Sequence, residues 1–82
     1  MYIELVTPDH VVFEGQADVV TLPGSEGSFQ ILNNHAPIIS SLKKGEIVIK
    51  TGKEELYFQV DAGVVEVLAN KITVLTEKAE ED

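Results

Sequence analysis

The chain has 82 residues, a formal net charge of −8 at pH 7, no cysteine and no arginine, and this length fits one domain. The lack of cysteine excludes a disulfide, a thiolate metal site and a thiol nucleophile, and His10 and His35 have no second ligand nearby, so we expect no metal. Without clustered Lys or Arg, nucleic acid and anionic lipid are not expected partners, because phosphates are bound by basic groups.

The first half of the chain alternates apolar and polar residues with a period of two, which is typical of strands that bury one face. Val, Ile and Thr occupy 23 of the 82 positions, and these residue types also favour strands. We expect strands at 2–7, 11–14, 16–22 and 28–32, separated by turns at 8–10, at Gly15 and at 23–27. The turn at 23–27 has the strongest composition, because Pro23 fixes one backbone angle and two Gly allow positive φ.

The second half continues with short strands and turns. We expect extended segments at 36–43, 46–50, 54–60, 64–68 and 71–76, with turns at 33–34, 44–45, 51–53, 61–63 and 69–70. No window shows a helical stripe, so the sequence predicts an all-β sandwich or barrel of about nine strands. We expect one sandwich domain over 1–77 and a frayed acidic tail over 78–82.

Uninterrupted apolar stretches reach only two or three residues, so neither a transmembrane helix nor a signal-peptide core is expected. We therefore expect a protein that stays in the cytosol. Charge is unevenly distributed, because residues 1–42 contain five acidic residues and no lysine. This acidic half strengthens the expectation that phosphates are not bound.

Catalytic chemistry is not indicated by the residue patterns. The segment 51–53 ends in Gly-Lys, but Ile47 and Glu54 stand where a phosphate loop needs Gly and Ser or Thr. The serines lack a Gly-x-Ser-x-Gly pattern, and no carboxylate pair can be assigned. Two alternatives stay open: an adaptor that binds another protein, and a small enzyme or ligand-binding barrel, which would show a deep pocket lined by reactive groups with shifted pKa values.

Two features of the segment after residue 34 favour an interaction module. His35 lies in a turn, where its imidazole either bonds to local backbone and orders the loop or contacts a partner. Ile38 and Ile39 are adjacent in an expected strand, so only one of them can face the core. The other is a candidate to dock on a second protein.

The segment 23–37, PGSEGSFQILNNHAP, resembles the motif PGxEGxFGxLxxHAP of the epsilon subunit of F-type ATP synthases. Three further parts are similar to that family: the first hairpin with LVTP at 5–8 and VFEG at 12–15, the turn LKKG at 42–45, and the last hairpin with GVVEV at 63–67 and ITVL at 72–75. The resemblance covers essentially the whole chain in the expected order.

The resemblance implies a flattened ten-stranded antiparallel β-sandwich without catalytic residues, cofactor or metal. It implies a subunit of the central rotor that links the gamma subunit to the membrane c-ring and passes torque for proton-driven ATP synthesis. Such a subunit is peripheral, on the cytoplasmic face of the bacterial inner membrane or of a photosynthetic membrane, with no direct lipid insertion.

The resemblance also implies site residues. The ring-facing loop corresponds to residues 26–34, with Glu26, Ser28, Asn33 and Asn34. The gamma-facing surface corresponds to Thr7, His35, Ile38, Ile39 and Ser40.

Three departures from the family pattern carry expectations. Some members have an acid where Ser28 stands, which leaves Glu26 as the candidate for a charge contact with the ring. Gln30 replaces the commoner Gly, so we expect no positive φ there. Many members continue as a helical hairpin that can inhibit ATP hydrolysis or bind ATP, and this sequence shows no such pattern. We therefore expect a short form that does neither.

Overall fold

The computed structural model describes all 82 residues as ten strands, and it contains no helix that is long and apolar enough to cross a membrane. The strands are β1 (Tyr2–Val6), β2 (Val11–Gln16), β3 (Val19–Gly24), β4 (Gly27–Leu32), β5 (Ile38–Leu42), β6 (Gly45–Thr51), β7 (Glu54–Val60), β8 (Gly63–Leu68), β9 (Lys71–Thr76) and β10 (Ala79–Glu81). The predicted all-β fold is confirmed, with the ten strands that the family resemblance implies.

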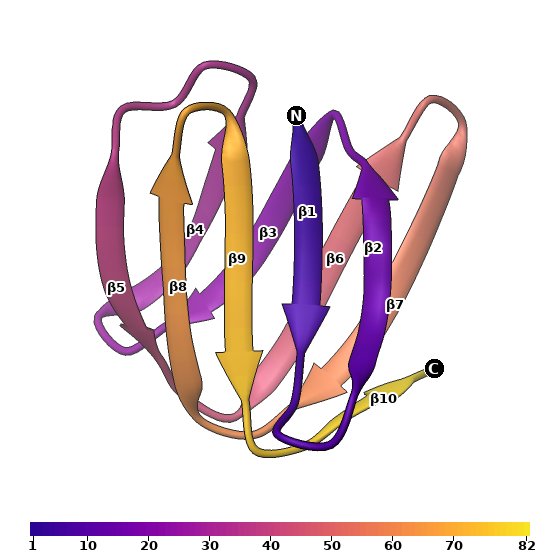
Figure 1. Cartoon of the computed structure of the whole chain (residues 1–82), viewed down its shortest axis with the longest axis vertical. Helices are drawn as coiled ribbons and strands as arrows, with labels where there is room; N and C mark the ends of the chain where they lie inside the picture. Colours follow the sequence, from indigo (N-terminus) through magenta and orange to yellow (C-terminus); the bar gives the residue numbers. More distant parts are fainter.

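The strands form two facing layers (Figure 1). The front layer has the order β5-β8-β9-β1-β2, and the back layer has the order β4-β3-β6-β7-β10. The layers join at one corner, where Gly24 of β3 pairs with Leu42 of β5. All pairs are antiparallel except β1 with β9, which is parallel. A parallel pair needs a long connection, and these two strands lie at opposite ends of the chain.

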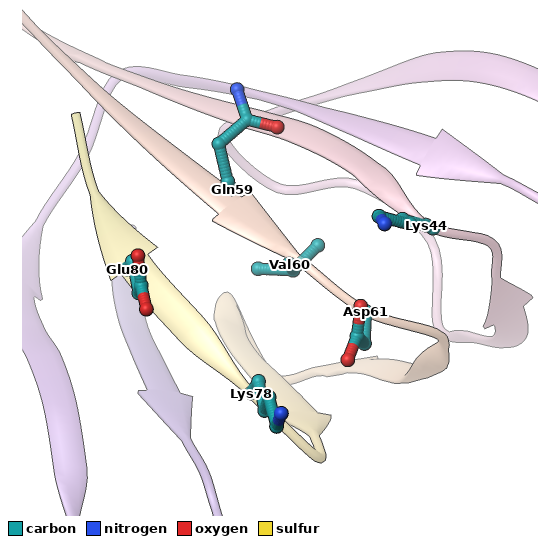
Figure 2. Close-up of a pocket in the computed structure, with 6 residues that line it drawn as sticks. All are labelled: Lys44, Gln59, Val60, Asp61, Lys78 and Glu80. Atoms are coloured by element: carbon teal, nitrogen blue, oxygen red, sulfur yellow. The ribbon is translucent and has the colours of Figure 1, made fainter.

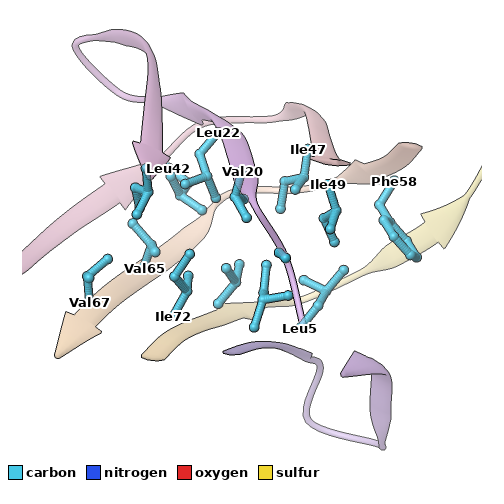
Figure 3. Packing of buried hydrophobic residues seen from close by; sticks show 14 of the residues in the cluster. Leu5, Val20, Leu22, Leu42, Ile47, Ile49, Phe58, Val65, Val67 and Ile72 are labelled. Carbon is cyan, nitrogen blue, oxygen red and sulfur yellow. The ribbon is translucent and has the colours of Figure 1, made fainter. Parts of the chain in front are cut away.

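The core lies between the two layers and is built from alternate positions of their strands (Figure 3). In β1, for example, Ile3 and Leu5 are fully buried while their neighbours are half-buried. Phe58 packs against Phe13 with a centroid separation of 5.6 Å. No charged side chain is buried, and no buried side-chain polar atom lacks a hydrogen-bond partner. The interior is therefore an apolar core whose few polar groups are hydrogen-bonded, as expected between the layers of a sandwich.

Several strand boundaries differ from the sequence expectation. The predicted strand at 16–22 is divided, because β2 ends at Gln16 and β3 begins at Val19. Gly15 does not interrupt a strand but pairs with Ile3 inside β2, and the irregularity lies instead in a register shift between Leu5 and Val6. Pro23 lies inside β3 and not in the turn, because the ladder from β3 to β6 ends at Thr21 and no partner needs a donor at Pro23. The turn that follows therefore contains only two residues.

The segment 78–82, which was expected to fray, instead contains β10. Ala79–Glu81 pair with Phe58–Val60 of β7, and the amide of Asp82 donates to the carbonyl of Tyr57 at 2.9 Å. Ala79 is half-buried against the core. The pairing supplies partners to backbone groups of β7 that would otherwise face water at a sheet edge, and the high charge of the segment does not prevent this.

Replacing a core leucine should destabilise the fold far more than replacing a surface leucine. We expect Leu5→Ala, at a fully buried site, to lower the free energy of unfolding by about 2–5 kcal/mol, because it removes buried methyl groups and leaves a cavity. Leu68→Ala, at a site that is 56% exposed, should cost about 0.5 kcal/mol or less. Urea unfolding of both variants measures the difference, and equal costs would contradict this assignment of the core.

Candidate interaction surfaces

One polar hollow of the molecule is shallow and mixed in charge (Figure 2). Its volume is about 340 Å³, and it lies beside the ends of β7 and β10. Its lining residues are Lys44, Gln59, Val60, Asp61, Lys78 and Glu80. Lysines and carboxylates interleave around it, so it presents no single charge to a ligand. The chain has no group of three or more potential metal-binding side chains.

Two exposed side chains and the half-buried Tyr2 have raised pKa values, and each is explained by a neighbouring carboxylate. The hydrogen bond from the Tyr2 hydroxyl to Glu14, at 3.0 Å, raises the pKa of Tyr2. Glu55 does the same to the pKa of Tyr57, and Asp82 raises the pKa of Glu46. None of the three lines a hollow. The shifts therefore reflect crowded surface acids and do not identify an acid–base site.

An apolar groove of about 370 Å³ runs along the start of β5 and the end of β8. Its lining residues are Pro37, Ile38, Ile39, Glu66, Val67 and Leu68. Ile38 packs against the core, whereas Ile39 is 74% exposed. The prediction that only one of the two isoleucines faces the core is confirmed, and the outward one lies in this groove.

His35 is held by the backbone of its own loop. Its Nδ1 lies 2.7 Å from the carbonyl oxygen of Ala36, and its amide donates to the carbonyl of Leu32 at 3.2 Å. A carbonyl only accepts, so Nδ1 carries the proton in this contact. The local role expected for the imidazole is thus present, and the half-buried ring orders the approach to the groove.

Thr7 and Ser40 do not line this groove. Thr7 is only 5% exposed, and its hydroxyl donates to the carbonyl of His10 at 3.4 Å. Thr7 follows β1, which β8 and β9 separate from β5, so the structure does not place it with Ile39. Ser40 is half-buried, and its hydroxyl donates to the Ser41 carbonyl at 3.4 Å.

The predicted loop over 26–34 is a strand with a turn at each end. Glu26 lies in the two-residue turn before β4, and Ser28 is exposed beside it. Asn33 and Asn34 follow β4, roughly 20 Å away at ~3.3 Å per residue. The turn at Glu26 and the two asparagines therefore lie at opposite ends of β4. The turn is anchored on β5, because the Ser41 hydroxyl donates to the Ser25 hydroxyl at 2.8 Å.

The two asparagines tie three segments together through Asn70, which the sequence reasoning missed. Asn33 Oδ1 accepts from the N-terminal ammonium of Met1 at 2.7 Å and from Asn70 Nδ2 at 3.4 Å. The amide of Asn34 donates to Asn70 Oδ1 at 2.8 Å. Asn34 and Asn70 have φ values of 62° and 61°. An Asn in a two-residue hairpin turn was the available signal, since Asn tolerates this region.

Comparison with known proteins gives one consistent family. Residues 1–82 match the family described as ATP synthase, delta/epsilon chain, beta-sandwich domain. The chain is 44% identical over 80 residues to an ATP synthase epsilon chain of Nitratidesulfovibrio vulgaris, covering 98% of this chain and 60% of that one. It is 36% identical over 81 residues to the ATP synthase epsilon chain of Caulobacter vibrioides, covering 99% and 94%.

The fold also matches a solved assembly. A chain in the cryo-EM structure of the Euglena gracilis mitochondrial ATP synthase, which contains OSCP, F1 and the c-ring, superposes with a TM-score of 0.90 at 17% identity. The match covers 96% of this chain and 51% of that chain. At this identity the likeness shows a shared fold. This chain spans less than two thirds of the length of the Nitratidesulfovibrio vulgaris epsilon chain.

Removing the Asn70 side chain should loosen the turn after β4. We expect Asn70→Gly, which tolerates the positive φ, to speed hydrogen exchange of the Asn34 amide about fivefold, because one hydrogen bond is worth about 1 kcal/mol. Asn70→Asp keeps the acceptor and should change the rate by less than about twofold. Amide exchange followed by NMR measures both variants. Unchanged exchange in Asn70→Gly would show that this bond does not hold the turn.

Proposed function

This chain belongs to the ATP synthase delta/epsilon family of β-sandwich domains, and we propose that it is a non-catalytic subunit of the rotor of an F-type ATP synthase. In this role the sandwich connects the gamma subunit to the c-ring, so that both turn together. The observation that carries the proposal is the family match over residues 1–82. It is supported by the match to the Caulobacter vibrioides epsilon chain, which covers 94% of that relative.

A torque-bearing connector must resist bending, and several features of the sandwich support this use. Of the 51 backbone hydrogen bonds, 42 lie within the strand ladders. The corner pairing of Gly24 with Leu42 joins the two layers into one continuous ladder. No charged side chain is buried in the core. Such a rigid domain deforms little under load, so it transmits force from one contact to the other.

The two contacts can be assigned to separate ends of β5. We assign the c-ring contact to the turn with Glu26 and to Ser28. The hydrogen bond between Ser41 and Ser25 holds this turn beside the end of β5. We assign the gamma contact to the apolar groove with Ile39, at the start of β5. Asn33 and Asn34 then position the loop that leads to the groove.

This arrangement makes the protein a peripheral member of a membrane-bound complex. Its contacts with the membrane pass through the c-ring, and no direct lipid insertion is part of the proposal. The side assigned to it is the cytoplasmic face of a bacterial inner membrane or of a photosynthetic membrane. We assign it neither ATP binding nor inhibition of ATP hydrolysis.

Association with gamma should depend on Ile39 more than on the back layer. We expect Ile39→Asp to weaken binding at least tenfold, because a carboxylate placed in an apolar contact loses its hydration. Glu54→Lys, at an exposed position of β7, should change binding by less than about twofold. Ile39 is preferred to Ile38, whose replacement would also disturb the core.

The measurement is co-purification of the chain with gamma, with and without the c-ring. Recovery of the wild-type chain with gamma supports the proposal, and improved retention with the ring supports the second contact. Failure to recover the wild-type chain with gamma would contradict the proposed function. Equal effects of the two substitutions would show that the groove is not the gamma contact.

A further inference from the structure

Residues 77–82, which we call the strap, lead from the front layer to the back layer at one end of the sandwich. After β9 the strap crosses to β7 and pairs with it as β10 (Figure 1). Lys78 and Glu80 line both the polar hollow of Figure 2 and a second hollow of about 160 Å³, which also includes Asp9 and His10. The strap therefore lies at the surface with open space beside it.

The inner end of the strap is firmly attached. The carbonyl of Lys78 accepts from the amide of Asp61 at 3.1 Å and from the hydroxyl of Thr76 at 2.8 Å. The next residue, Ala79, is half-buried against the core. Two hydrogen bonds and an apolar contact therefore meet within two residues.

The outer end of the strap is held beside a second carboxylate. The amide of Asp82 donates to the carbonyl of Tyr57 at 2.9 Å. Gln59 Nε2 donates to Asp82 Oδ2 at 3.2 Å and to Glu46 Oε2 at 3.1 Å, so one amide group holds two carboxyl groups together. A hydrogen bond with Asp82 is the main cause that raises the pKa of Glu46, followed by desolvation and by the charge of Asp82. When both groups are ionised, they repel each other.

No cation neutralises this carboxyl pair. The one ion pair within 4.0 Å in the chain joins Lys71 to Glu4, on other strands. Strand β3, on the far side of β6, has no titratable residue. The remaining charged or titratable groups around the pair are Lys44 in the turn before β6, Glu55 and Tyr57 on β7, and Glu80 and Glu81 on β10. The surroundings are therefore mainly acidic, and they add to the repulsion.

We propose that the outer end of the strap, residues 80–82, is a pH-sensitive latch that closes on β7 when Glu46 and Asp82 share a proton and loosens when both are ionised. The latch is a property of the sandwich and is independent of the proposed rotor role. Its loosening uncovers backbone groups of β7 at a sheet edge, where another strand can pair. The contacts of Lys78 and Ala79 limit the opening to residues beyond them.

The closed latch is favoured by acid. The pKa of Glu46 is raised while Asp82 lies beside it, and it returns toward its ordinary value of 4.5 when Asp82 moves away. The closed state therefore binds the shared proton more tightly than the open state. This added stability is fully present below pH 4.5 and is lost as the pH rises through the raised pKa.

The test is proton exchange of the Asp82 amide with water, measured by NMR on the 82-residue chain and corrected for the intrinsic rate. We expect about threefold more protection at about pH 4 than at about pH 7, because exposed charge interactions are weak. The Asp61 amide, which is bonded to the inner end of the strap, should be equally protected at both pH values.

Two substitutions identify the groups responsible. Glu46→Gln keeps an oxygen that can accept from Gln59 and removes one charge, so it should raise the protection of the Asp82 amide about threefold at about pH 7 and remove most of its pH dependence. Glu54→Gln, at the other end of β7, is the matched control and should behave as the wild type. Both sites are exposed, and thermal unfolding shows that each variant is folded.

Salt tests the repulsion separately. Raising the ionic strength from about 0.05 M to about 0.5 M at about pH 7 screens the two exposed carboxylates, so the protection of the Asp82 amide should rise about twofold in the wild type. Glu46→Gln should show no such rise, because the pair then has only one charge.

Three outcomes would overturn the proposal. Equal protection of the Asp82 amide at both pH values in the wild type refutes the latch. An unchanged pH dependence in Glu46→Gln refutes the carboxyl pair as its cause. An equal change at the Asp61 amide shows that the whole strap loosens, which refutes a latch confined to residues 80–82.

Discussion

The period of two along each strand is the constraint on which the rest of this structure depends. Each strand has one set of side chains between the layers. The buried side chains are apolar except for Thr7 and Thr76, whose hydroxyls donate to backbone carbonyls, because an unpaired charge would be costly there. All charges and surplus apolar residues must then lie on the two outer faces or at the strand ends. Strand register decides which of them become neighbours. The same alternation that assigns apolar residues to the core therefore also determines which residues form the surfaces.

Much of the fold could be predicted from that alternation, and the failures occurred where pairing overrides local pattern. Gly15 and Pro23 are strand breakers in sequence, but one has a partner in Ile3 and the other lies where no ladder bond is required. The segment with Ala79 is too charged to predict as a strand, yet the open edge of β7 gives its backbone a partner. These outcomes depend on which strands become neighbours, and local pattern does not contain that information.

In the candidate surfaces, too, local features could be predicted from the sequence, whereas features that depend on strand pairing could not. The outward direction of Ile39 followed from its position beside Ile38, and the backbone contact of His35 followed from its turn. Gln30 has no positive φ, as expected from a residue that replaces Gly. By contrast, Thr7 proved to be buried, and residues 26 and 34 proved to be separated by the length of β4. The alignment of Val64, Leu75 and Val6 across β8, β9 and β1 could not be found from the sequence, because it depends on the parallel pairing of β1 with β9.

A connector that only transmits rotation needs two surfaces held at a constant separation, and a continuous ten-stranded sheet folded around an apolar core provides that rigidity without chemistry. Hydrogen exchange of the chain, free and within an assembled ATP synthase, tests this account most directly. It predicts added amide protection in the turn at Ser25–Glu26 and in β5 and β8, with β6 and β7 unchanged. Protection confined to β6 and β7, or an equal loss of protection throughout the sandwich on assembly, would contradict it.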